Sequence, residues 1–471
     1  MNIRGTVVTS LAALALIAAG CGGDDEGGGN GGGGNGAAES GGDLSGTQLT
    51  IWTNEFQPDR MEKTEAILAD FREETGVETE LVPVPDDQLA PLMTNAAAAG
   101  ELPDVVLGTP MSDSQGYAAE GLFDAEAAQA VVDKLGADTF SQNALDLVSA
   151  DGVATGVPSD GWGMLLIYRT DLFDEAGIDP PETLDDISAA AEQLNGDGMA
   201  GITLATAPGD GFTAETFEHI GLALGCQLVN DAGEVTFDSP ECIEALEWYA
   251  DIARNYSVPG AQDVESTRGT YFAGRAAMVM WSPFILDGMA GLRNDTRPSC
   301  PQCKKDRGFL AKNSGLVGPL AGASGEPTQL GVVTTSNIGT DTDTEAAQAL
   351  IEYMMTDGYV RWLSVSPQGK YPVRPGEGDE YETAWAELES GVDRQAPLAD
   401  FYSEASITAL GDATDTLSRW AFAQGQGALL GAMAGEQPVA NAVAAVIAGD
   451  DPAEVAAETQ ETIEEIQAGL E

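Results

Sequence analysis

The stretch that decides the fold class is "LVPVPDDQLAPLMTNAAAAGELPDVVLG", which runs from Leu81 to Gly108. Its first residues end a segment, "VETELVPV", in which apolar and polar residues alternate as they do in a β-strand. Gln88–Gly100 is rich in alanine and predicts a helix, which Pro103 prevents from continuing. "DVVLG" is a short apolar strand. The order of strand, helix and strand predicts a β-α-β unit whose strands are parallel.

The flanking segments continue the same alternation. Leu49–Phe56 is apolar and β-rich, and Asp59–Gly76 carries apolar residues at helical spacing before a terminating glycine. Tyr117–Phe123 and Ala125–Lys134 predict two further helices. The repeated alternation predicts an α/β fold in which mainly parallel sheets are flanked by helices. About 420 residues follow the N-terminal region, which is enough for two domains with their own cores.

The N-terminus predicts export from the cytoplasm. Arg4 precedes an apolar stretch, Val7–Ala19, of the length typical of a signal peptide. It is shorter than the roughly 20 apolar residues that span a bilayer. The next residues, Ala18-Ala19-Gly20-Cys21, resemble the cleavage motif of bacterial lipoproteins, although Ala18 stands where leucine is usual. We therefore expect residues 1–20 to be a signal peptide and Cys21 to carry lipid. The alternative is an ordinary signal peptide followed by an unmodified cysteine.

Residues 21–48 contain mostly Gly, Asn, Asp, Glu and Ser. Such a segment has too few apolar side chains to offset the entropy lost on ordering. It predicts a flexible linker with an r.m.s. span of about 30 Å. The expected location is therefore extracytoplasmic, with the protein anchored through Cys21 to the outer face of the cell membrane.

The charge of the chain excludes one class of partner. There are 20 Lys and Arg against 77 Asp and Glu, a net charge of −57. The phosphates of a nucleic acid would be repelled. Such acidity suits a salty medium, in which repulsion between carboxylates is screened. The single histidine, His219, leaves few possibilities for a metal site or for histidine-dependent catalysis. We expect no cofactor and no bound metal.

Four cysteines follow Cys21, and their even number in an exported chain indicates disulfides. Three pairings are possible. The most local one joins Cys226 to Cys242 and Cys300 to Cys303, and it is the pairing that we predict. A zinc site made of all four cysteines is the alternative.

The order of several segments resembles that of a known family. They are "FREETGVETELVPV", "AAAAGELPDVVLG", "GVPSDGWGMLLIYRTDLFDEAGIDPPETLDDI", "YFAGRAAMVMWSPF" and "EAAQALIEYMMTDGYVRWLSVSPQGKYPVRPG". Together they resemble the extracellular solute-binding proteins of ABC importers, family 1, the sugar-binding branch similar to maltose-binding protein. The resemblance covers nearly all of Leu49–Glu471. One departure is Leu184, which stands where many members have tryptophan.

This resemblance implies a periplasmic-binding-protein type II fold with two α/β lobes. The first lobe would combine residues 49–156 and 328–370, and the second would combine 157–327 and 371–471. A ligand would bind between the lobes, which would close around it by a hinge motion. The resemblance also implies a monomer that works with a separate membrane permease.

The candidate ligand-binding residues follow from the same resemblance and from the chemistry of sugars, whose hydroxyls need polar partners and whose C–H faces need aromatic rings. Parallel sheets place ligands at the carboxyl ends of strands. The candidates are Asn54, Glu55, Thr109, Pro110, Asp113, Asp160, Trp162, Trp281, Phe284, Arg374 and Trp420. In "MWSPF" the stacking ring is either Trp281 or Phe284. The alternatives are a plain loop after "DVVLG" and a surface ion pair for Arg374. Trp420 is expected to be a partly buried stacking ring.

The predicted function is therefore the capture of a sugar, an oligosaccharide or a glycoside, for an ABC importer, and not catalysis. A binder of another solute, such as a polyamine or a metal, is the first alternative. A glycosidase with paired carboxylates is the second, but 77 acidic residues allow pairs anywhere and none is singled out. Turnover discriminates the two classes, because a receptor returns its ligand unchanged.

Overall fold

The computed structural model describes residues 44–322 and 327–470, and these belong to one compact unit that begins at Leu44. The predicted signal peptide and the lipidation site Cys21 lie outside the described residues. Of the predicted linker, only residues 44–48 are described. Leu44 already packs against the hydrophobic core, and the Gly46 amide donates to the Gly76 carbonyl. The ordered unit therefore starts a few residues before the first predicted strand.

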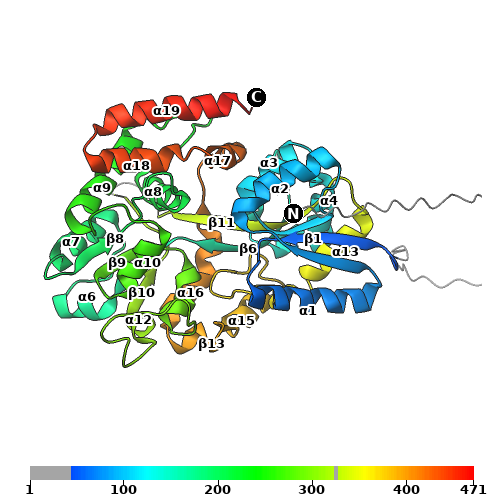
Figure 1. The fold of residues 1–471 in the computed structure, drawn as a ribbon, viewed down its shortest axis with the longest axis horizontal. Coiled ribbons are helices and arrows are strands. Elements are labelled where there is room, and N and C mark those ends of the chain that lie inside the picture. Colours follow the sequence, from blue (N-terminus) through cyan, green and yellow to red (C-terminus); the bar gives the residue numbers. More distant parts are fainter. Residues whose placement is uncertain (1–43, 323–326, 471) are drawn as a thin grey trace, which may run out of the picture. The chain divides into compact units, whose positions relative to one another are not determined.

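The two strands of the stretch Leu81–Gly108 belong to the larger of the two main sheets (Figure 1). Its strand order is β14-β11-β3-β1-β2, and β6 pairs with β11. The bounds are β1 Gln48–Thr53, β2 Glu78–Pro83, β3 Val105–Pro110, β6 Val157–Gly163, β11 Gln329–Ile338 and β14 Leu417–Ser418. Strand β1 lies between β2 and β3 and is parallel to both. The predicted β-α-β unit is confirmed, with β1 inserted between its two strands.

The helices of this part of the chain include α1 Pro58–Thr75, α2 Asp86–Ala99, α3 Met111–Ala119, α4 Ala125–Leu135 and α13 Thr344–Met354. The predicted glycine terminators are confirmed. Gly76 and Gly100 follow α1 and α2 with φ angles of 73° and 67°, a region that glycine enters without a steric penalty. One helix prediction is wrong, because α3 begins at Met111 directly after β3 and ends at Ala119, whereas we expected a helix over Tyr117–Phe123.

The smaller main sheet has the order β10-β7-β9-β8, with bounds β7 Leu165–Arg169, β8 Ala200–Thr203, β9 Ala276–Trp281 and β10 Ser314–Val317. Only β8 and β9 are parallel, since three helices connect them and give the chain room to return. Strand β7 is antiparallel to both β9 and β10. The expectation of a mainly parallel sheet is therefore wrong here, because β7 enters this sheet straight from β6 and not through a crossover helix.

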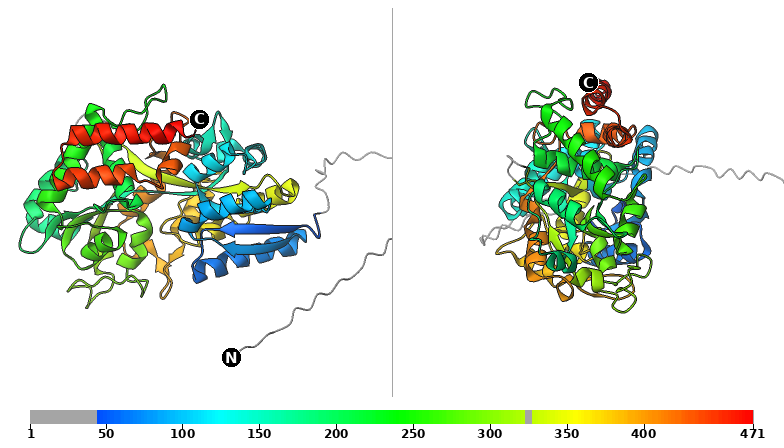
Figure 2. Two further views of the ribbon diagram at one scale, coloured as in Figure 1. Left: turned by 45° about the horizontal axis from the view of Figure 1, so that its top comes forward. Right: turned by 90° about the vertical axis from the view of Figure 1, so that its left-hand side faces the viewer.

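Helices cover this second sheet as well. They include α7 Leu184–Leu194, α8 Gly211–Leu224, α9 Pro240–Tyr256, α18 Pro438–Ala448 and α19 Pro452–Ala468. The last two, drawn in the orange and red of the C-terminal end, lie side by side (Figure 2). The part of the chain after Leu363 contributes to both sheets and their helices. Strand β14 joins the larger sheet, and α18 packs against α9 of the other half.

The chain passes from one sheet to the other at Met164, the single residue between β6 and β7. Strand β6 is hydrogen-bonded to β11 in the larger sheet along most of its length. Tyr371 pairs with the same strand, because the amides and carbonyls of Gly161 and Tyr371 form reciprocal hydrogen bonds. Figure 1 shows β6 and β11 running between the two groups of helices. Strand β6 therefore belongs to the larger sheet and leads directly into the smaller one.

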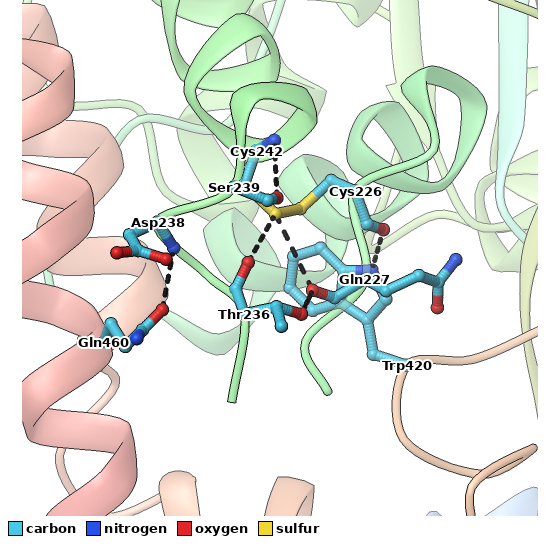
Figure 3. The surroundings of a disulfide bond; sticks show 8 residues. All are labelled: Cys226, Gln227, Thr236, Asp238, Ser239, Cys242, Trp420 and Gln460. Carbon is cyan, nitrogen blue, oxygen red and sulfur yellow. Dashed lines mark hydrogen bonds between the residues drawn. A yellow bond between two sulfur atoms is a disulfide. The ribbon is translucent and has the colours of Figure 1, made fainter. Parts of the chain in front are cut away.

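The four described cysteines form the two local pairs, Cys226 with Cys242 and Cys300 with Cys303, with Cα–Cα distances of 4.6 and 5.0 Å. The first pair lies beneath helix α9 in a buried cluster of aliphatic and aromatic side chains. Figure 3 shows its surroundings, in which the Trp420 indole N–H donates to the Cys226 carbonyl. This disulfide thus ties the end of α8 to the start of α9.

We predict that non-reducing peptide mapping will recover these two pairs. Replacing Cys226 and Cys242 by alanine together should lower the free energy of unfolding by about 3 kcal/mol, because a loop of this length is then free in the unfolded chain. Denaturant unfolding measures the difference. The Cys300–Cys303 disulfide closes a much shorter loop. The matching double replacement of these two cysteines should therefore lower the free energy of unfolding by less. Free thiols in the purified exported protein would contradict both pairings.

Candidate functional site

A cavity of about 440 Å³ lies between the two main sheets. From the larger sheet it is lined by residues that follow β1 and β3, and by β6 and β11. From the other half it is lined by α8, by Phe284 and by the segment between Arg419 and Val439. The carboxyl ends of the parallel strands β1 and β3 open towards it, as expected for sheets of this kind. The cavity therefore collects residues from the whole length of the described chain.

Lys370 is the centre of a buried cluster of charges at one end of the cavity. Its ammonium lies 2.7 Å from a Glu55 carboxylate oxygen and 3.2 Å from an Asp160 carboxylate oxygen. The side chains of Lys370, Glu55 and Asp160 are only 3%, 7% and 1% exposed. Arg60 adds a second cation, 2.6 Å from Glu55. The Trp362 indole N–H donates to Asp160 at 2.8 Å, and the Lys370 ammonium lies 4.2 Å from the centre of that ring.

The cluster holds Glu55 and Lys370 in their charged forms. Burial by itself would raise the pKa of Glu55, but the charges of Lys370 and Arg60 outweigh it and lower the pKa from 4.5 to about 2. Burial likewise favours the neutral form of Lys370, and the carboxylates of Asp160 and Glu55 reverse this and raise its pKa. Since the ions neutralise one another, the buried charges remain compatible with the low dielectric of the interior.

A second cluster of charges lines the opposite wall. The Arg419 guanidinium lies 3.2 Å from Glu218 and 3.7 Å from Glu215, two residues of α8. Glu218 also accepts from the Trp420 amide at 2.8 Å. Burial raises the pKa of Glu218, although Arg419 opposes the change. This cluster fixes the segment around Trp420 against α8.

Aromatic rings also line the cavity. Trp162 on β6 is half-buried, and its ring meets that of Phe284 edge to face at a centroid distance of 6.2 Å. The Arg60 guanidinium lies 5.8 Å from the Phe284 ring centre. Gly369 packs directly against Phe284, so that a Cβ at this position would collide with the ring. Phe422 adds a further ring to the lining. Rings beside carboxylates are the two kinds of surface that a sugar needs.

The structure brings most of the predicted site residues together. Those that line the cavity are Asn54, Glu55, Pro110, Asp113, Asp160, Trp162, Phe284 and Trp420. Trp420 differs from its expectation, because it is 1% exposed and its ring meets Phe217 and Phe237 edge to face. The prediction of a partly exposed stacking ring is therefore wrong for Trp420.

Three predicted residues are absent from the lining. Thr109 lies between Gly108 and Pro110 on β3, and since side chains alternate along a strand it turns to the other face, where it is 1% exposed. Trp281 ends β9 and packs on Phe212 at 4.5 Å, which leaves Phe284 as the ring that "MWSPF" contributes to the lining. In the remaining case, Arg374 donates to the carbonyls of Met355 and Leu135 and to the Thr139 hydroxyl. It is 8% exposed and no surface ion pair.

Sequence reasoning missed several lining residues: Arg60, Glu215, Glu218, Lys370, Arg419 and Phe422. Lys370 is one of only six lysines, and that scarcity was the available signal. Arg419 directly precedes Trp420, one of the predicted site residues. For neither residue does the local sequence pattern show that its ion-pair partners come from distant segments of the chain. His219, in contrast, is fully buried in α8, where its Nδ1 accepts from the Leu330 amide and burial lowers its pKa to about 3.

Known proteins resemble this chain in sequence and in fold. The family model described as bacterial extracellular solute-binding protein matches residues 66–389, well over half of the chain. The chain belongs to this family of extracellular solute-binding proteins. One relative of this solute-binding protein is YcjN of Escherichia coli (strain K12), named as a candidate ABC transporter periplasmic-binding protein. It is 28% identical over 323 residues, which are 65% of this chain and 68% of the relative.

Solved structures show the same fold. The GacH receptor of Streptomyces glaucescens superposes with a TM-score of 0.68 at 18% identity, covering 90% of this chain and 98% of that one. Maltose-bound MalE3 of T. maritima superposes with a TM-score of 0.67 at 18% identity, covering 89% and 99%. The predicted fold class, the two-lobed fold of maltose-binding-like periplasmic proteins, is confirmed. Among the described residues, no helix of the solute-binding protein is both long and apolar enough to cross a membrane.

We predict that Lys370→Met lowers the free energy of unfolding by about 3–5 kcal/mol at pH 7, because Asp160 is left buried without this cation and Glu55 keeps only Arg60. The stability that Glu55 contributes in the wild type is present above pH 4.5 and is lost as the pH falls through about 2. The deficit of the variant should therefore shrink as the pH falls over this range. Denaturant unfolding between pH 7 and pH 2 measures it.

The matched control for this variant is Lys312→Met. Lys312 and its partner Asp306 are both 47% exposed, so this replacement should change the free energy of unfolding by less than about 1 kcal/mol. Equal losses for the two lysine variants would show that the buried cluster has no special role.

Proposed function

We propose that this solute-binding protein captures a sugar, an oligosaccharide or a glycoside, in the cavity between its sheets and delivers it to the permease of an ABC importer. The observation that carries the proposal is the composition of the cavity wall. Trp162 and Phe284, both half-buried, offer apolar ring surface, and carboxylates of both charge clusters also line the cavity. Rings can receive the C–H face of a pyranose, and carboxylates can accept from its hydroxyls.

Structural neighbours support the ligand class. The GacH receptor is described in complex with acarbose and MalE3 with bound maltose, and both share the fold of this chain. The size of the cavity is also in the range of small-molecule sites. The proposed lobe closure would bend the chain near Met164, where it passes between the two sheets.

A calorimetric screen of maltose, laminaribiose, acarbose and spermidine tests the ligand class, with mass spectrometry of any small molecule that copurifies. A sugar that binds and is recovered unchanged supports the proposal. Tighter binding of spermidine than of every sugar would instead support the polyamine alternative. Conversion of the sugar to a product would support the glycosidase alternative.

We predict opposite behaviour for two tryptophans of the site. Trp162→Ala should weaken binding of the sugar more than about tenfold, since a half-buried ring then no longer contacts the ligand. Trp420→Ala should instead lower the free energy of unfolding without ligand by about 3–5 kcal/mol, because its ring is core. Titration calorimetry and thermal unfolding give the two measurements for each variant. Trp162→Phe, which keeps a ring, should lose less affinity than Trp162→Ala.

We propose further that Cys21 carries the membrane anchor. The support is the Ala18-Ala19-Gly20-Cys21 motif after an apolar segment. Cys21→Ala should leave the protein without lipid, and it should then be released from membranes instead of partitioning with detergent. Stable anchoring takes more than one acyl chain, so loss of the modified cysteine should be decisive. Unchanged detergent partitioning of the variant would contradict the anchor.

A further inference from the structure

The charges that line the cavity are balanced at one end. In the Lys370 cluster two cations, Lys370 and Arg60, face two carboxylates, Glu55 and Asp160. Lys370 is 3% exposed and Arg60 is 14% exposed, and both already contact carboxylates. A negatively charged ligand would have to compete with these carboxylates for either cation. This end of the cavity is consequently a neutral surface.

The opposite wall carries a surplus of negative charge. Arg419 is its only lining cation among the described residues, and it serves two carboxylates directly, Glu218 and Glu215. The carboxylate of Asp113 also lines the cavity and is close enough to raise the pKa of Arg419 along with the two glutamates. Three carboxylates thus act electrostatically on one guanidinium, and two of them contact it. We call Arg419, Glu215, Glu218 and Asp113 the acidic corner.

Helix dipoles offset only a part of this surplus. The N-termini of α3, α8 and α18 line the cavity, and each is equivalent to about half a positive charge. Helix α3 already has Asp113 in its first turn, and α8 is capped by Asp210, which accepts from the Phe212 amide. Helix α18 has neither an acidic N-cap nor an acidic side chain in its first turn. The acidic corner therefore keeps a negative potential.

Glu215 is the member best placed to receive a ligand. Its side chain is 31% exposed, against 4% for Glu218 and 14% for Arg419. Burial, together with the neighbouring carboxylates of Glu218 and Asp210, raises the pKa of Glu215 in spite of Arg419. A group whose ionised form is disfavoured by its neighbours gains from a cation that arrives beside it.

We propose that the acidic corner selects sugars by charge, binding an ammonium-bearing sugar in preference to its neutral counterpart and rejecting its carboxylate-bearing counterpart. An ammonium offers three N–H donors. The carboxylates of Glu215 and Asp113 can accept charge-assisted hydrogen bonds from them. A sugar carboxylate would meet the surplus of negative charge and would find each lining cation already paired. This inference rests on the proposed capture of sugars and adds the substrate class within it.

The test compares three forms of each of three disaccharides by titration calorimetry at pH 7. Maltose, laminaribiose and cellobiose are each used as the neutral sugar, as the 2-amino-2-deoxy derivative and as the 6-carboxylate. For any skeleton that binds, the amino form should bind more tightly than the neutral form, and the carboxylate at least about tenfold more weakly than the neutral form. A carboxylate that binds as tightly as its neutral sugar, or an amino form that binds more weakly than it, overturns the charge selection alone and leaves sugar capture standing.

Two variants assign the selection to the acidic corner. Glu215→Gln and, separately, Asp113→Asn should each reduce the ratio of affinities between the amino and carboxylate forms, by about tenfold or more for Glu215→Gln. The matched control is Glu461→Gln, which removes one charge from an exposed position of α19. An unchanged ratio in both corner variants overturns the proposal. If no form of any skeleton binds, the proposed capture of sugars fails together with it.

Discussion

The ammonium of Lys370 ties together three segments that the chain order keeps apart. It contacts Glu55 after the first strand and Asp160 on the strand that leads into the second half, while Lys370 itself directly precedes Tyr371, which pairs with Gly161 of β6. Ions buried to this degree are tolerated only when each has its partner. The end of β1, strand β6 and the segment before Tyr371 must therefore keep one mutual arrangement. That arrangement is also what forms one end of the cavity.

The rings of the cavity depend on the same arrangement. Trp162 lies two residues beyond Asp160 on β6, so that the strand which is fixed by the ion cluster also presents this ring. Phe284 reaches the cavity because Gly369, next to Lys370, leaves room for it. A bulky residue at position 369 would displace the ring even though it touches no ligand. Aromatic positions in such a site are thus set by the packing of the connecting segments as much as by the rings themselves.

The two ends of the cavity use charge differently. At the Lys370 cluster the ions are deeply buried and matched in number, so they act mainly to hold the structure. At the acidic corner Glu215 is partly exposed and the carboxylates outnumber the cation, so charge remains available to a ligand. The enormous acidity of the whole chain gives no hint of this difference. It is visible only once the partners of each cation are known.

The sequence by itself determined the fold class and most of the polar positions at the strand ends. Local periodicity and glycine caps suffice for the unit from Leu81 to Gly108, since a helix or strand depends on its own residues. Asn54, Glu55 and Asp113 followed from the rule that parallel strands end at the site. The expectation of mainly parallel strands failed at β7, because the direction of a strand depends on how the chain enters the sheet.

Only the tertiary structure decided which side chains are buried and which are open to the cavity. Trp420 and Trp162 were both predicted to line the cavity, yet one ring is enclosed by Phe217 and Phe237 and the other is half-buried. Lys370 and Asp160 are 210 positions apart, so no local pattern could pair them. Burial and charge pairing are properties of contacts between distant segments. The sequence therefore specified the strands and helices, and their packing decided the chemistry of the cavity.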